Sequence, residues 1–433
     1  MRSAVKTRYL FFAASLLAVL WGIRHTQGEQ IDPLSTETFA PMEQVTLLVA
    51  TDLHYLTPEL TDHEAYFQEV VQNADGKMTG YSEELLEAFV QQVIDEAPDG
   101  LILSGDLTFN GASLSHQRLA EKLQRIEAAG IPVLVIPGNH DLEDPMAAEF
   151  IGDGYRPAET ITAEQFEERY DNFGYREALA RDEASLSYVA ELAPNLRILL
   201  VDANTAEAPG KVTASTLAWV EEQLRSAADS GAWVIAVGHQ DLLVHDRLFK
   251  EGYLLEDHRQ LLALYERYPV ICALSGHIHL QHIAESASGL PEIVTSSLAV
   301  SPNQYGILRL EGRTASYETA PVDVAAWAEE QGIQDRALLD FPDTARQFFW
   351  DTGYRQAIRE QGDTAEGRKL AAFFADVNTA YFAGRMDTVH WEEALFDAWQ
   401  RKDTFLSHYL ASIADDGYRD HTTAHFPFGG IAS

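Results

Sequence analysis

Five short polar motifs contain residue types that could do chemistry, and each follows an apolar run that could be a buried strand. Each motif contains a histidine or an aspartate. In chain order they are Asp52-Leu53-His54, Gly105-Asp106, Gly138-Asn139-His140-Asp141, Gly238-His239 and Gly276-His277-Ile278-His279. In an α/β sheet the loops that leave neighbouring strands meet at the carboxyl edge, where ligands bind. We therefore expect the five motifs to form one site.

The donors in these motifs are carboxylate and amide oxygens and imidazole nitrogens. Because no thiolate is among them, the set suits Mn, Fe, Zn, Ni or Co better than a structural zinc site built on cysteine. The candidate ligands number seven, which is more than one ion needs. They are Asp52, His54, Asp106, Asn139, His239, His277 and His279. Two divalent metal ions that share a bridging carboxylate would use all of them and keep positions open for water and substrate.

His140 is the candidate catalytic residue, because it lies next to Asn139 but is not needed as a ligand. Two ions about 3.5 to 4 Å apart could hold a hydroxide at neutral pH, and this hydroxide could attack a bound substrate in line with the bond that breaks. The leaving group then needs a proton, which His140 could supply as a general acid. Asp141 is expected either to orient His140 or its loop, or to cap a helix.

The composition restricts the classes of function. With 433 residues, of which 46% are hydrophobic and 23% charged, the chain has the composition of a globular protein. Its net charge of -36 at pH 7 would repel a phosphate backbone, which argues against a nucleic-acid duplex as a partner. Its single cysteine, Cys272, excludes both an intramolecular disulfide and a thiolate metal cluster.

Alternation of apolar runs with helical patterns predicts an α/β fold. Runs that could be strands buried on both faces lie at 45–50, 101–103, 132–136, 196–201, 233–237 and 270–274. Strand-like runs after residue 280 lie at 292–295, 305–310 and 315–318. We expect these later runs to form a second sheet that packs on the first.

The region 324–433 lacks comparable strands, and apolar residues recur at helical spacing over 370–382. It is predicted to be a C-terminal helical domain that shapes the cleft, mediates dimerisation or adds stability. The aromatic residues of the insertion 142–195 either line the pocket, where one could stack on a base, or pack a local helix on the core.

Residues 1–28 have the pattern of an export signal, with Arg2, Lys6 and Arg8 ahead of an apolar run from Tyr9 to Ile23. The run is shorter than the roughly 20 residues that span a bilayer, which favours a signal peptide. Its weak cleavage pattern leaves an uncleaved membrane anchor as the alternative. We expect an exported protein, secreted or at the cell surface, with this segment as its one attachment to a membrane.

The ordered set of five motifs resembles the calcineurin-like metallophosphoesterase superfamily over residues 44–320. The resemblance implies two stacked mixed sheets flanked by helices, a four-layer sandwich, with the helical domain of 324–433 added. It also implies a first ion held by Asp52, His54, Asp106 and His279. A second ion would be held by Asp106, Asn139, His239 and His277, with Asp106 as the bridge.

The loop Gly105–Gly111 separates branches of this superfamily. Phe109 stands where protein Ser/Thr phosphatases have a second aspartate and where purple acid phosphatases have an iron-binding tyrosine, so neither branch matches. The remaining resemblance is to the cyclic-nucleotide phosphodiesterase branch, whose exported bacterial members carry a C-terminal helical domain.

The expected function is that of a metallophosphoesterase, a phosphodiesterase dependent on two metal ions that hydrolyses small phosphate esters, with cyclic nucleotides as the expected class. Two alternatives stay open: a phosphomonoesterase or nucleotidase with the same metals, and a non-catalytic binding protein at the cell surface. The scarcity of basic residues favours diesters, because a monoester dianion usually needs more cationic groups.

Overall fold

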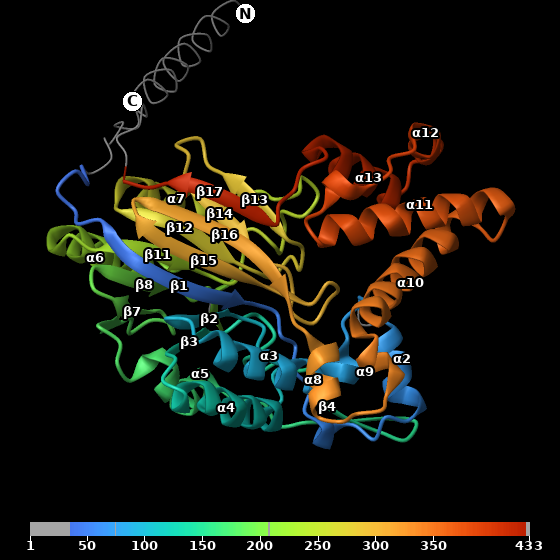
Figure 1. Cartoon of the computed structure of the whole chain (residues 1–433), viewed down its shortest axis with the longest axis horizontal. Helices are drawn as coiled ribbons and strands as arrows, with labels where there is room; N and C mark the ends of the chain where they lie inside the picture. Colours follow the sequence, from blue (N-terminus) through green and yellow to red (C-terminus); the bar gives the residue numbers. More distant parts are fainter. Residues whose placement is uncertain (1–34, 74, 207, 430–433) are drawn as a thin grey trace, which may run out of the picture. The chain divides into compact units, whose positions relative to one another are not determined.

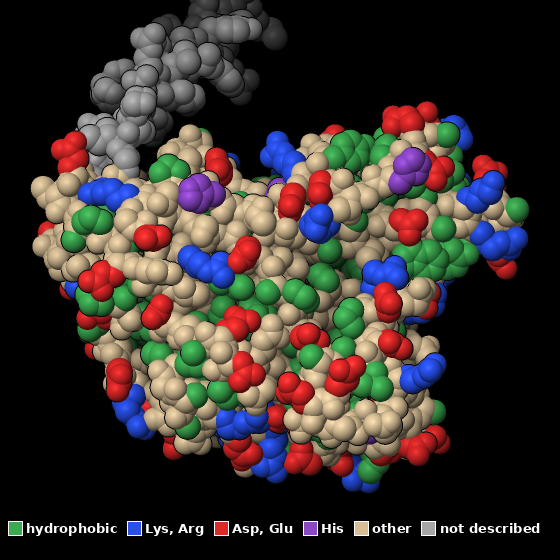
Figure 2. All heavy atoms as spheres, viewed as in Figure 1, with side chains coloured by type: hydrophobic (Ala, Val, Ile, Leu, Met, Phe, Trp, Pro, Cys, Tyr) green, Lys and Arg blue, Asp and Glu red, His purple; other side chains and the backbone are tan. Residues whose placement is uncertain are grey.

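The computed structural model describes residues 35–73, 75–206 and 208–429 (Figure 1). The export signal predicted for residues 1–28 lies outside these ranges. Within them, no helix is both long and apolar enough to cross a membrane. Acidic side chains are spread over the face shown in Figure 2 rather than gathered in one patch.

The first large sheet has six strands in the order β17-β16-β15-β1-β2-β3. Their bounds are Met42–Ala50 (β1), Gly100–Ser104 (β2), Val133–Ile136 (β3), Gln304–Gly312 (β15), Thr314–Pro321 (β16) and Thr423–Pro427 (β17). The strands β1, β2 and β3 run parallel, whereas the other three pair antiparallel. Strand β17 comes from the region predicted to be helical, and it fits an edge position because only Ala424 and Phe426 turn toward the core.

The second large sheet has seven strands in the order β13-β14-β12-β11-β8-β7-β6. Their bounds are Ala180–Arg181 (β6), Tyr188–Ala193 (β7), Leu196–Leu200 (β8), Trp233–Val237 (β11), Val270–Ser275 (β12), His282–Glu285 (β13) and Pro291–Val294 (β14). The expected division of strands between sheets was wrong, because β15 and β16 join the first sheet and β8, β11 and β12 form the second. Local periodicity cannot reveal that β15 pairs with the distant β1.

Helices cover the sheets, and strand β11 shows how the layers arise. Val234 and Ala236 pack with Val220 of α6 (Ala214–Ser230) and Leu261 of α7 (His258–Arg267). Ile235 lies in the other core, with residues of both sheets. Because successive strand residues point to opposite faces, one strand serves both layers. Helices α3 (Ser82–Glu96) and α4 (Ser113–Ala128) lie beside β2 and β3 (Figure 1).

Shorter elements lie in the loops that follow the strands and in the insertion 142–195. The helices are Ala65–Gln72 (α2), Ala163–Arg169 (α5), Pro58–Leu60 (η1), Thr79–Tyr81 (η2) and Asp171–Tyr175 (η3). The strand pairs are Ala148–Ile151 (β4) with Gly154–Pro157 (β5), and Asn204–Thr205 (β9) with Ala208–Pro209 (β10).

The C-terminal region is helical up to residue 416. Its helices are Val324–Glu330 (α8), Arg336–Leu339 (α9), Phe341–Gln361 (α10), Ala365–Phe382 (α11), Met386–Thr388 (η4), Glu393–Gln400 (α12) and Phe405–Asp416 (α13). The apolar pattern seen at 370–382 is the buried face of α11. This face shares a core with Ile278, Leu280 and Val294 beside the second sheet. The predicted fold class, two stacked sheets flanked by helices plus a helical C-terminal region, is therefore confirmed.

Candidate metal centre

The structure places all five motifs at the carboxyl ends of strands. Asp52, Asp106 and Asn139 follow β1, β2 and β3 of the first sheet, and His239 and His277 follow β11 and β12 of the second. The backbone N–H of His277 donates to Asp52 Oδ2 at 2.9 Å. The site therefore lies where the edges of the two sheets meet.

The backbone at five of the candidate ligands has a positive φ angle. The values are 51° for Asp52, 42° for His54, 46° for Asp106, 66° for His277 and 64° for His279. A non-glycine residue in this left-handed region costs on the order of 1–3 kcal/mol and persists only where the surrounding structure holds it. One such restraint is the bond from the His54 N–H to the Asp106 carbonyl, 3.0 Å long. The strain is concentrated where side chains must converge.

Two glycines of the motifs allow these side chains to approach the backbone. A Cβ atom at Gly138 would lie 2.1 Å from Asp106 Oδ1, and one at Gly105 would lie 2.5 Å from His239 Nδ1. Neither distance is possible for a real side chain. Glycine is therefore required at both positions by the packing of the candidate ligands.

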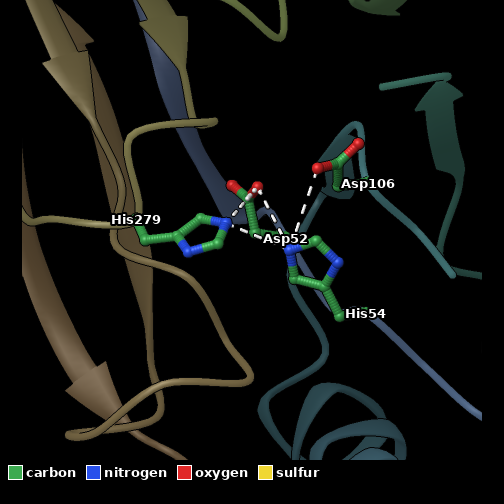
Figure 3. A group of neighbouring side chains, drawn as sticks. All are labelled: Asp52, His54, Asp106 and His279. Atoms are coloured by element: carbon green, nitrogen blue, oxygen red, sulfur yellow. Dashed lines mark hydrogen bonds and ion pairs between the residues drawn. The ribbon is translucent and has the colours of Figure 1, made fainter. Parts of the chain in front are cut away.

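One group of side chains consists of Asp52, His54, Asp106 and His279, which point toward one another (Figure 3). The Nε2 atoms of His54 and His279 are 3.0 Å apart, and His279 Nε2 is 3.2 Å from Asp52 Oδ1. His54 Nε2 lies 3.8 Å from Asp106 Oδ2. Asp52 Oδ1 is buried without a hydrogen-bond partner. Such an orphaned oxygen beside two ring nitrogens fits a cation that the three atoms would share.

A second group consists of Asp106, His239 and His277. His239 Nε2 lies 3.3 Å from Asp106 Oδ1 and 3.1 Å from Asn139 Oδ1. The other ring nitrogens donate to backbone carbonyls: His239 Nδ1 to Ser104 at 2.9 Å and His277 Nε2 to a carbonyl at 2.7 Å. In a neutral ring these bonds hold the proton, so that His239 Nε2 and His277 Nδ1 would be the nitrogens available to a cation. The structure thus brings all seven predicted ligands together.

Without an ion, burial and the neighbouring charges shift the pKa values of the aspartates and histidines of the site. Burial would raise the pKa of Asp52, but His279 and His239 hold it well below its usual value. Burial lowers the pKa of His239, yet the neighbouring Asp106 raises it to about 9. Burial also lowers the pKa of His277, to about 4. A cation bound here would replace the proton that Asp106 draws onto His239.

His140 has a carboxylate partner that the sequence did not suggest. Its Nδ1 atom donates to Asp144 Oδ2 at 3.1 Å. Burial lowers the pKa of His140, but Asp144 and Asp106 together raise it. The Asp141 side chain is fully buried and accepts the N–H groups of Leu107, Thr108 and Gly138. Of the roles considered for Asp141, the structure shows that of holding the loops.

A pocket of about 510 Å³ opens on this site. Asp106, His140, His277 and His279 line it, and the face opposite them comes from the C-terminal helices α10, α11 and α13. Among its described lining residues Lys77 is the single lysine or arginine. The helical region therefore shapes the cleft, which was one of its three expected roles.

The aromatic residues of the insertion 142–195 do not line this pocket. Phe166, Tyr170, Phe173 and Tyr175 are buried in the main core, and Tyr155 is exposed on strand β5. Their role is the packing of a local helix, which was the second of the two expectations.

Comparison with known proteins agrees with this geometry. A family model described as calcineurin-like phosphoesterase matches residues 45–281, more than half of the chain. The chain belongs to the calcineurin-like phosphoesterase family. A second model, the C-terminal domain of cyclic nucleotide phosphodiesterase, matches residues 323–420 of this phosphoesterase. The predicted resemblance is thereby confirmed.

Two curated relatives of this phosphoesterase are bacterial. It is 25% identical over 240 residues to a "Probable glycerophosphodiester phosphodiesterase GpdQ" of Arcobacter nitrofigilis, which covers 54% of this chain and 76% of the relative. It is 28% identical over 186 residues to "Glycerophosphodiester phosphodiesterase GpdQ" of Enterobacter lignolyticus, over 42% of this chain and 57% of the relative.

Among solved structures, the phosphoesterase is similar to a dimetal phosphatase from Danio rerio, with a TM-score of 0.48 and 15% identity over 64% of this chain and 96% of that one. A purple acid phosphatase from yellow lupin gives a TM-score of 0.43 and 14% identity over 67% of this chain and 53% of that one.

Sequence reasoning missed two residues of the phosphoesterase site. Lys77 enters the pocket from the loop between α2 and η2, and no spacing rule connects it with the motifs. Asp144 lies one helical turn beyond His140 in the chain, a spacing at which side chains can meet. That spacing was the one available signal.

Proposed function

We propose that the protein is a phosphodiesterase that uses two divalent metal ions and hydrolyses cyclic nucleotides. The observation that carries the proposal is the position of Asp106, which belongs to both groups of potential ligands. One ion would be held by Asp52, His54, Asp106 and His279, and the other by Asp106, Asn139, His239 and His277. The oxygen and nitrogen donors suit Mn, Fe, Zn, Ni or Co.

The chemistry divides between the ions and the side chains. Two bound ions would supply a water acidic enough to ionise near neutral pH and positive charge for the phosphoryl oxygens. When the phosphorus–oxygen ester bond breaks, the leaving oxygen needs a proton. His140 would give it from Nε2, because Nδ1 is engaged with Asp144. Asp144 would stabilise the protonated ring before that transfer.

Several observations support a diester as the substrate. A diester carries a single negative charge on its phosphate, and the pocket offers one flexible cation, Lys77, beyond the proposed ions. A volume of about 510 Å³ leaves room for a second ester group. Both curated relatives are named as glycerophosphodiester phosphodiesterases. The family model at residues 323–420 supports a cyclic nucleotide within that class.

The first test compares hydrolysis of bis(p-nitrophenyl) phosphate and p-nitrophenyl phosphate by protein stripped with chelator and supplied again with Mn. We expect activity that disappears with the metal, returns with Mn and favours the diester. A monoester preference would instead indicate a phosphomonoesterase or nucleotidase. Absence of hydrolysis with Mn, Fe, Zn, Ni and Co would indicate a binding protein.

We also infer that the protein is exported, on the basis of the charged and apolar pattern of residues 1–28. Expression of the full chain, followed by fractionation and mass measurement of its amino terminus, tests this. A shortened chain outside the cell would indicate a cleaved signal, and a full-length chain in the membrane fraction an anchor. A full-length chain in the cytosol would contradict export.

A further inference from the structure

Five rings form a continuous aromatic wall along one side of the pocket: His277, Tyr253, Phe249, Tyr409 and Phe405. The ring centroids are 5.3 Å apart for His277 and Tyr253, and 5.1 Å for Tyr253 and Phe249. They are 5.5 Å apart for Phe249 and Tyr409, and 6.4 Å for Tyr409 and Phe405. Since each step is within reach of ring-to-ring contact, the wall leads without a break from a proposed metal ligand to an exposed ring.

The aromatic wall depends on both parts of the molecule. Phe249 and Tyr253 lie four residues apart in the loop 238–257, and Phe405 and Tyr409 lie four residues apart on α13. Side chains at this spacing on a helix share one face. Phe405 is 59% exposed although it lines the pocket, whereas Tyr409 is 5% exposed. The wall thus passes from partly buried rings through the buried Tyr409 to an open outer end at Phe405.

Another helix offers polar groups to the same pocket. Phe349, Thr352, Gly353 and Gln356 of α10 line it, and their spacing of three, four and seven residues puts them on one helix face. Gln356 is exposed. Gly353 is buried, and it packs against Phe374 and Ala375 of α11.

Asn378 of α11 presents a hydrogen-bond donor beside that glycine. Its Oδ1 atom accepts the Tyr409 hydroxyl at 2.9 Å, so its Nδ2 group is the one left for a ligand. A Cβ atom at Gly353 would be 3.6 Å from this Nδ2. Asn378 therefore packs next to Gly353, at the end of the pocket formed by the helices.

We propose that the aromatic wall and the facing residues of α10 and α11 form a subsite for a flat heteroaromatic base, with Phe405 and Gln356 as specificity-determining residues. The inference rests on the proposed phosphodiesterase function and names its substrate class: a diester that carries a nucleobase. The phosphate lies at His140 and His277, and the base stacks toward Phe405. Stacking on the rings would accept any base, and the side-chain amides of Gln356 and Asn378 would form hydrogen bonds with the polar atoms at the edge of the base.

The test uses Phe405→Ala and Phe405→Leu in the metal-loaded enzyme, with Tyr418→Ala as the matched control. Tyr418 is also an exposed aromatic side chain of the helical region, 52% exposed, but it does not line the pocket. The substrates are 3′,5′-cyclic AMP and glycerophosphoethanolamine, a diester without a ring. Adenosine, which has the base but no phosphate, serves as an inhibitor.

For Phe405→Ala we expect KM for cyclic AMP to rise roughly 5- to 20-fold, the size of one lost base-stacking contact, with kcat changed less than about twofold. Phe405→Leu should behave similarly, because leucine keeps apolar volume but has no ring face. The inhibition constant of adenosine should rise in parallel. Kinetics with glycerophosphoethanolamine, and every parameter of Tyr418→Ala, should match the unmodified enzyme.

Equal effects of Phe405→Ala on both substrates would overturn the subsite while leaving the phosphodiesterase proposal intact. An unmodified enzyme that hydrolyses glycerophosphoethanolamine but neither hydrolyses cyclic AMP nor responds to adenosine would overturn both the subsite and the cyclic-nucleotide substrate, and would leave a phosphodiesterase of other diesters. If no diester is hydrolysed, the proposed function fails, and calorimetric titration with adenosine still decides the subsite. Weaker binding in Phe405→Ala would then support it, and unchanged or absent binding would overturn it.

Discussion

Two of the groups of potential ligands in the described part of the chain consist of two histidines and one aspartate within 4.8 Å of one another, yet they differ in where the ring protons lie. One is the group Asp106, His239 and His277 at the sheet edge. The other joins His282 of β13, Asp416 at the end of α13 and His421 before β17. We call the second the interdomain cluster, because it connects the second sheet with the C-terminal region.

In the first group each histidine donates a ring N–H to a backbone carbonyl. His239 Nδ1 donates to Ser104 and His277 Nε2 to Gly252. A carbonyl oxygen can only accept, so in the neutral rings the lone pairs are on the opposite nitrogens, His239 Nε2 and His277 Nδ1. Without a cation, Asp106 instead draws a second proton onto His239, and a bound cation would take the place of that proton.

In the interdomain cluster His421 has the reverse arrangement. Its Nδ1 atom accepts the N–H of Ile283 at 3.2 Å, so the ring proton must be on Nε2, which lies 3.3 Å from Asp416 Oδ2. His282 Nε2 is 3.1 Å from the other oxygen of Asp416. A protonated nitrogen beside a carboxylate is an attractive pair without a metal. Proximity alone therefore does not define a metal site; the partner of the second ring nitrogen does.

The largest expected difference between the two groups is in metal content. His277→Ala removes a lone pair from the proposed site, so the metal-to-protein ratio should fall from two to about one and nearly all hydrolysis should be lost. His421→Ala should keep the ratio at two. Plasma mass spectrometry after dialysis measures both. A ratio of three in the unmodified protein that falls in His421→Ala would refute the proton assignment.

His140→Ala separates the proposed proton donor from the ligands around it. Both ions should stay bound, while kcat should fall about 10²- to 10⁴-fold, the usual contribution of general acid–base catalysis. Asp144→Asn keeps the His140 ring but replaces its charged partner with a neutral amide, and should lower kcat by less than His140→Ala does. Metal analysis and steady-state kinetics with a diester check this. Loss of metal in His140→Ala would place His140 among the ligands.

The interdomain cluster should make stability depend on pH. Burial lowers the pKa of His282 to about 4, whereas the ring in the unfolded chain takes up a proton near pH 6.5. As pH falls from 6.5 to 4, the unfolded chain binds a proton on this ring that the folded protein does not bind. The free energy of unfolding therefore falls in this window, by at most about 3 kcal/mol. Denaturant unfolding of the unmodified protein and of His282→Gln should show a weaker pH slope in the variant. Identical pH slopes of the unfolding free energy in the two proteins would contradict this prediction.

The same contrast explains what the sequence could and could not predict. Each proposed ligand lies within a few residues of a buried strand, and the parallel arrangement brings those strand ends together. Residues 282, 416 and 421 share no such element, because β17 returns to the first sheet only after the helices. Lys77 and Phe405 likewise enter the pocket from segments whose position depends on tertiary packing. Local pattern therefore predicted which side chains meet in the proposed metal site, and distant pairing determined the rest of the pocket.

The smallest expected effect concerns what the interdomain cluster contributes to folding. His421 is 5% exposed, and its loss would leave the Ile283 N–H without its partner and remove the ring that lies 3.3 Å from Asp416 Oδ2. His421→Ala should therefore lower the unfolding free energy by about 1–3 kcal/mol, the cost of unpaired buried polar groups, with kcat and metal content unchanged.

His408 is the matched control on the surface. It also lies beside an aspartate, Asp403 at 2.7 Å, but both side chains are mostly exposed. His408→Ala should change stability by less than about 1 kcal/mol. Equal losses in the two variants, measured by denaturant titration, would show that the buried cluster contributes no more than a surface pair, and burial would then not explain its place between the sheet and the helices.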